Sequence, residues 1–218
     1  MKKRIISAVT AIVMGTTAAA PAFASEAEPV REIFCGEYVE DEPGRDRLLI
    51  FDLDSEGARE ANEMMISMAD KTNYMASDNF SSCCGTLLSI VHVTHGLSDM
   101  SDYVTGTIDL ATGDRLDNHE LIAMTGLSEE EFIEWLRPLM AEKFKTEAEL
   151  VRYKYDDYLR CFFHTITNEF CRIDIPMYVT DKGTLAAVPQ IRLLYGSGIG
   201  RRVIDTGLSV VGAQEVLK

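Results

Sequence analysis

Short apolar runs rich in β-branched residues and bounded by turn residues recur along the chain, and this pattern predicts strands. The strongest run is Thr86–His95. Tyr103–Leu110 follows it closely enough to form an antiparallel hairpin through residues 96–102. The same criteria predict further strands over residues 33–39, 47–53, 170–179, 184–194 and 202–204.

Other segments have apolar residues at the 3.6-residue spacing of a helix packed on a core. Residues 55–71 carry alanine and methionine side chains at this spacing. Ser128 begins a second helix with a capping-box sequence, and Pro138 is expected to kink or split that helix. Residues 117–124 predict a short helix, whereas residues 156–168 suit either a helix or a strand.

These elements predict an α+β fold with a mostly antiparallel sheet and about three packing helices. The 218 residues suffice for one full-sized core. Hydrophobic residues make up 46% of the chain, which is ordinary for a globular protein and argues against disorder. We therefore expect a single compact unit over residues 33–218.

The N-terminal 24 residues have the pattern of a secretory signal peptide. Lys2, Lys3 and Arg4 precede an apolar stretch, and residues 21–24 supply an Ala-x-Ala cleavage site. We expect residues 1–24 to be removed, residues 25–32 to form a flexible leader, and the protein to be secreted or held at the cell surface. The alternative is that the N-terminal segment is not cleaved and serves as a membrane anchor. No later segment is long and apolar enough to cross a bilayer.

Net charge limits the classes of partner. The chain has 21 basic and 35 acidic residues and a formal net charge of −14. Cleavage would remove the three basic residues of the signal and lower this charge to −17. Such a surface argues against binding nucleic acid, because few positive groups are present to neutralise phosphates. It favours cationic partners, although acidity for solubility alone gives the same composition.

Five cysteines lie beyond the signal sequence, and an odd number leaves at least one outside any intramolecular disulfide. Cys83 and Cys84 are adjacent and would point to opposite faces of a strand. Cys161 and Cys171 are the favoured pair, although the sequence does not determine the connectivity. The absence of a Cys-x-x-Cys motif and the scattered histidines argue against zinc.

Two small constellations suggest chemistry. Asp52, Asp54 and Glu63 have the spacing of positions one, three and twelve of a calcium-binding loop, but acids at the N-terminus of a helix explain the same residues. His95 with Asp99 or Asp102 is a candidate acid–base pair across the predicted hairpin turn. The simpler interpretation is a loop histidine hydrogen-bonded to a turn carboxylate, because no hydrolase motif accompanies the pair.

Two stretches of the chain resemble known sequences. One runs from Leu87 through His95-Gly96 and the Asp-x-x-Thr-Gly turn at Asp109–Gly113 to Leu116, and the other is the Tyr-x-Thr-Asp-x-Gly turn within Met177–Leu185. Together they resemble the RsiV-like exported domains, over about residues 33 to 205. Such domains form the extracellular parts of lysozyme-sensing anti-sigma factors and the N-terminal modules of some secreted peptidoglycan deacetylases.

The resemblance implies a stand-alone exported module that binds a component of the cell wall, or a cationic protein such as lysozyme, without catalysis. No cofactor is implied. The alternative expectation from the residues is a cell-wall hydrolase that uses His95 with Asp99 or Asp102.

Overall fold

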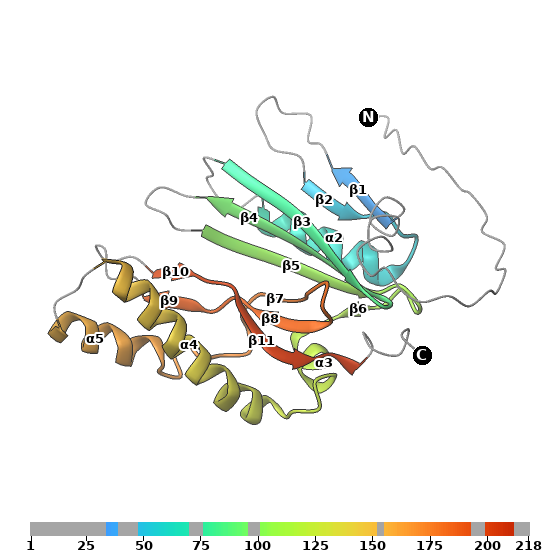
Figure 1. The fold of residues 1–218 in the computed structure, drawn as a ribbon. Coiled ribbons are helices and arrows are strands. Elements are labelled where there is room, and N and C mark those ends of the chain that lie inside the picture. Colours follow the sequence, from blue (N-terminus) through green and yellow to red (C-terminus); the bar gives the residue numbers. More distant parts are fainter. Residues whose placement is uncertain are drawn as a thin grey trace, which may run out of the picture.

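The predicted hairpin of residues 86–110 forms the centre of a four-stranded antiparallel sheet (Figure 1). The structure, a computed structural model, describes residues 34–38, 48–69, 76–95, 101–151, 155–192 and 199–211. The strand order is β3-β4-β5-β6, with the bounds Ala76–Cys84, Leu87–His95, Ser101–Asp109 and Arg115–Leu116. All residues of β4 except His95 are buried, because other elements cover both faces of this strand.

A two-stranded ribbon and a helix cover one face of the four-stranded sheet. β1 (Cys35–Tyr38) pairs with β2 (Leu48–Phe51), and α2 (Glu56–Ala69) follows. The side-chain amide of Asn62 accepts the N–H of Phe51 and donates to its carbonyl oxygen, both at 2.9 Å, and so joins α2 to β2. The contact between these elements and the sheet buries Phe51, Ala58, Ala61, Met65, Leu88, Ile90, Val104 and Ile108.

A three-stranded sheet packs on the opposite face. Its order is β11-β8-β7, with β7 at Met177–Val179, β8 at Thr184–Ala187 and β11 at Ile204–Ser209. Val179 lies on the edge strand β7, where Ser82 donates to its carbonyl oxygen and Ser89 accepts its N–H. The two serine hydroxyls therefore satisfy edge main-chain groups that the interface between the sheets buries.

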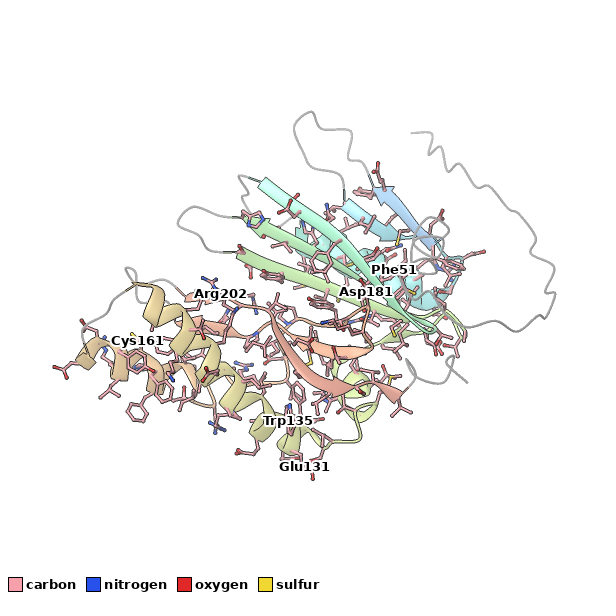
Figure 2. All side chains as sticks on the ribbon, in the orientation of Figure 1. Phe51, Glu131, Trp135, Cys161, Asp181 and Arg202 are labelled. Carbon is pink, nitrogen blue, oxygen red and sulfur yellow. The ribbon has the colours of Figure 1, made fainter. Side chains whose placement is uncertain are left out.

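Helix α4 (Glu129–Val151) covers the far side of the three-stranded sheet, and α5 (Tyr155–Thr165) packs beside α4 (Figure 1). The short helix α3 (Asn118–Ala123) precedes α4. A two-stranded ribbon of β9 (Gln190–Arg192) and β10 (Ile199–Arg201) lies beside α4. Figure 2 shows Trp135 and Arg202 along α4. Trp135 donates to the carbonyl oxygen of Thr206 on β11, and Arg202 pairs with Glu147 of α4.

The predicted fold class is confirmed: the described residues form one compact α+β unit with antiparallel sheets, with four helices rather than about three. Several details differ from the expectations. The segment 184–194 is split into β8 and β9, and the strand expected over residues 202–204 begins only at Ile204 and continues to Ser209. Helix α4 continues through Pro138 without being split. Of residues 170–179 only the last three form a strand, because the segment before them turns beneath α4. Residues 76–84 form β3 although no strand was predicted there.

The predicted signal peptide at residues 1–24 and the leader at residues 25–32 lie outside the described residues, as does Asp99. Within the described ranges, no helix combines the length and the apolar character needed to cross a membrane.

Candidate functional site

A groove of about 630 Å³ follows the outer edge of β5, between α2 on one side and the segment leading into β7 on the other. Its lining includes residues 102–107 of β5, the start of α3, and residues 173–177. A volume of this size is typical of sites that take a small molecule or a short peptide. We therefore treat this groove, called the β5 groove below, as the candidate binding site.

Among the residues that the structure describes, the wall formed by β5 includes a stretch of strand edge without a paired strand, called the free edge below. β6 pairs only with Thr107 and Ile108, whereas β4 pairs with β5 along its whole length. No described strand pairs with the outer side of residues 103–106. Alternate N–H and C=O groups of an edge strand point away from its neighbour, so this stretch offers main-chain hydrogen bonds to the groove.

The N-terminus of α2 and the turn after β5 hold the end of the groove. Ser55 caps α2 by accepting the N–H of Ala58 at 3.1 Å, and its hydroxyl donates to the carbonyl oxygen of Gly113 at 2.7 Å. A Cβ at Gly57 would lie 2.2 Å from the main-chain nitrogen of Arg115. Glycine therefore permits the helix to approach the turn closely, and this contact positions β6 and Arg115 beside the groove.

Among the described residues, Arg115 differs from the groove aspartates in having no oppositely charged or capping partner for its side chain. Asp102 is bound by Arg201 at 2.7 Å, and Asp174 is bound by Arg172. Asp117 caps α3 by accepting the N–H of Glu120 at 2.9 Å. Arg115 is half-buried, and its guanidinium lies 3.3 Å from the sulfur of Met64 with no described acidic residue in ion-pair distance. The groove thus has internal partners for its aspartates and one arginine without an acidic partner.

His119 supplies a second cation at the same end of the groove when it is protonated. Its Nδ1 lies 2.5 Å from a carboxylate oxygen of Glu129. This hydrogen bond, together with the negative charge of Glu129, raises the pKa of His119 above its ordinary value. The stabilisation that this interaction gives the fold is fully present at a pH below the pKa of His119 in the unfolded chain. That stabilisation is lost as the pH rises through the higher pKa that His119 has in the folded protein.

Replacing Glu129 by glutamine is expected to lower the pKa of His119 toward the ordinary histidine range of about 6.5. The measurement is an NMR titration of the His119 ring. Glu130→Gln serves as the matched control, because Glu130 is a neighbouring exposed carboxylate that makes no ion pair with His119. Equal pKa values in the wild type and Glu129→Gln would contradict the assigned cause.

The structure gives His95 different partners from the predicted ones. Its Nε2 lies 2.9 Å from a carboxylate oxygen of Asp78 on β3, and its Nδ1 lies 3.0 Å from the hydroxyl of Ser101 on β5. Asp102 is not a partner of His95. In the β4–β5 ladder, His95 lies opposite Ser101, whereas Asp102 lies opposite Thr94. The side chains of His95 and Asp102 therefore point to opposite faces of the sheet. The predicted pairing of His95 with Asp102 is therefore wrong, and Asp99 lies outside the described residues.

Two of the candidate calcium residues, Asp52 and Asp54, precede α2, and the third, Glu63, lies within that helix. Asp54 is exposed and pairs with Arg59 at 3.0 Å, while the exposed Glu63 lies within the helix. Nowhere in the described ranges do three or more His, Cys, Asp or Glu side chains gather closely enough to hold a metal ion. Asp52, Asp54 and Glu63 are thus not brought together, and Ser55 rather than an acid caps the helix.

The favoured disulfide is not formed in the structure, where Cys161 and Cys171 are both free thiols. Cys171 is buried beneath α4, with its sulfur 3.4 Å from the carbonyl oxygen of Ile133. Burial raises the pKa of the Cys171 thiol, which disfavours the thiolate that disulfide formation requires. Cys161 instead packs with Phe144 and Ile191 between α5 and the β9–β10 ribbon. The two residues belong to different apolar clusters.

Sequence reasoning missed both Arg115 and Asp78: Asp78 belongs to no motif, and Arg115, which lies near the end of the first resembling stretch, was assigned no role. The motifs that carry the resemblance instead form structural turns: Gly113 has φ +79° and Gly183 has φ +72°. Asp181, which lies in the second turn (Figure 2), accepts the N–H of Cys83 and joins that turn to β3. Comparison of the chain with models of known protein families and with curated protein sequences finds no match.

Proposed function

We propose that this chain is an exported, non-catalytic binding module that acts at the bacterial cell envelope, with either a wall component or a cationic protein such as lysozyme as its ligand. The observation that carries the proposal is the β5 groove, which combines an open strand edge with side chains able to orient a ligand. The signal sequence and the resemblance to RsiV-like domains supply the location.

The charges of the groove support binding rather than catalysis. A general acid or base must exchange a proton with its substrate, which a carboxylate held by an internal partner does poorly. Asp102 and Asp174 are each paired with an arginine, and Asp117 caps a helix. The net charge of −14, which cleavage would lower to −17, would in addition attract a cationic protein over long range.

The test is retention of the purified protein on insoluble peptidoglycan and on immobilised lysozyme at physiological salt. We expect retention by at least one of the two. A polylysine resin is the control, because attraction by charge alone would give equal retention on that resin. Failure of both ligands to retain the protein, or equal retention on polylysine and lysozyme without any on peptidoglycan, would contradict the proposal.

A second candidate function is hydrolysis of wall glycans or peptides at His95. Ser101, His95 and Asp78 form a continuous hydrogen-bonded chain of hydroxyl, imidazole and carboxylate. In an acyl transfer the Ser101 oxygen would attack the substrate carbonyl while its proton passes to Nδ1 of His95, and Asp78 would stabilise the resulting imidazolium. His95 would return that proton to the leaving amine as the peptide C–N bond breaks, and water would then hydrolyse the ester formed on Ser101.

This alternative predicts turnover of a labelled wall polymer by the wild-type protein and its loss in His95→Ala. Asp102→Asn is the matched control, because Asp102 lies near the same end of the sheet but points to the other face. Lack of turnover by the wild-type protein would eliminate the hydrolase, and unchanged ligand retention by His95→Ala would then support a binding module.

A further inference from the structure

We propose that the free edge of β5 takes up a short extended peptide as an additional strand, and that Arg115 binds the terminal carboxylate of that peptide. The inference rests on the proposed function, because it assigns a ligand class to the same groove. Three features of the groove carry it: the free edge, the position of β6, and the arginine without an acidic partner.

The strand edge supplies the affinity that does not depend on sequence. The outer side of residues 103–106 has no described strand partner, and these residues line the groove. An extended peptide laid along this edge would form main-chain hydrogen bonds and continue the sheet, which is a recurrent mode of peptide recognition. Successive side chains of the peptide would then point alternately toward the two walls of the groove.

The two walls are suited to such alternate side chains. Met64 and Met68 of α2 line one wall, and Pro176 and Met177 line the other. Met68 is 46% exposed although it is a large apolar residue. Methionine adapts its conformation to ligands of different shape, so this wall would accept several small apolar side chains.

The position of β6 determines where the peptide ends. β6 already occupies the edge of β5 at Thr107 and Ile108, so an added strand cannot continue past residue 106. Arg115, the first residue of β6, pairs with Ile108, one residue beyond the Leu116–Thr107 pair, and its side chain lines the groove beside Met64. A peptide end that meets Arg115 and carries a carboxylate is a C-terminus, and the bound peptide would therefore run parallel to β5.

Arg115 is also the charge that such an end requires. The aspartates of the groove have internal partners, whereas the guanidinium of Arg115 has, among the described residues, only the sulfur of Met64 within hydrogen-bond distance. A guanidinium binds a carboxylate through two parallel hydrogen bonds, and burial strengthens that interaction. The occupant we assign is the C-terminal segment of a protein chain, because its L-residues can alternate between the two walls as an added strand while its terminal carboxylate meets Arg115.

The experiment measures binding of the purified protein to a fluorescein-labelled peptide, Thr-Val-Thr-Val-Ala, with a free C-terminal carboxylate. We expect conversion of the carboxylate to an amide to weaken binding by about 10- to 100-fold, since a hydrogen bond to a charged group is lost. Arg115→Gln should weaken binding of the free acid by a similar factor and leave binding of the amide unchanged. Arg160→Gln, at an exposed arginine of α5 outside the groove, is the matched control.

Strand addition is tested by two further peptides that are N-methylated on alternate residues. Only one of the two registers should lose binding, because only alternate N–H groups face β5. Equal affinity of the acid and the amide, or equal loss in both N-methylated registers, would overturn the inference. The ligand-side changes leave the protein intact, so a variant that fails to fold does not affect this outcome.

Competition with an all-L peptide of the same length and with a muramyl pentapeptide tests the assigned occupant. Preferential competition by the all-L peptide supports a protein C-terminus, and preferential competition by the muramyl pentapeptide would overturn it. Retention on peptidoglycan or lysozyme without any binding of the free-acid peptide would contradict the groove inference alone. Binding of the free-acid peptide without retention on peptidoglycan or lysozyme would contradict the envelope function alone.

Discussion

Replacing Gly57 by alanine is expected to destabilise the protein by about 2 to 3 kcal/mol, although alanine favours a helix intrinsically by about 1 kcal/mol over glycine. The added Cβ would lie 2.2 Å from the nitrogen of Arg115 and 2.6 Å from the carbonyl oxygen of Gly113. Both are main-chain atoms, so no side-chain rotation relieves the contact. Either α2 or the turn at residues 111–115 must move.

The measurement is thermal unfolding, in which this loss corresponds to a fall in Tm of about 5 to 10 °C for a protein of this size. Gly36→Ala is the matched control, because the nearest atom to its added Cβ is the Cβ of Asp52 at 3.4 Å, an ordinary contact. Binding of the free-acid peptide should also weaken in Gly57→Ala, since the contact positions Arg115. An unchanged Tm would show that α2 does not dock on this turn.

Local patterns predicted the fold where the pattern and the final environment agree. β4 is rich in β-branched residues and is one of the two inner strands of its sheet, and the capping box at Ser128 begins α4 as predicted. β3 could not be predicted in this way, because Ser, Asp and Asn are weak strand formers. Pairing with β4 along nine residues makes this polar segment a strand, and such a partner is not visible in a local window.

The candidate site was less predictable because distant segments build it. Proximity in the sequence suggests Asp99 or Asp102 as the partner of His95, whereas its carboxylate partner Asp78 lies 17 residues away on the neighbouring strand. The β5 groove unites α2, β5, α3 and the segment before β7, and none of them carries a binding motif. Only the alternation of side chains along a hairpin whose register is known would have excluded Asp102 in advance.

The second large effect is expected at the helical side of the core. Phe132 of α4 is fully buried among the side chains that join α3, α4 and the three-stranded sheet, including Leu121, Leu136 and Met177. Phe132→Ala should reduce the free energy of unfolding by about 3 to 5 kcal/mol, because it removes apolar contacts and leaves a cavity in a tightly packed region. The corresponding fall in Tm is about 10 to 15 °C.

Phe163→Ala is the control for this substitution, because it removes the same atoms from a side chain of α5 that is 60% exposed. Its expected cost is below about 1 kcal/mol, since Phe163 loses mainly its edge contact with Phe162. Chemical denaturation of both variants supplies the comparison. If Phe132→Ala costs no more than Phe163→Ala, α4 does not cover the three-stranded sheet. If the difference is as large as expected, α4 is a fixed part of the core, and the three-stranded sheet it supports holds one wall of the β5 groove in place.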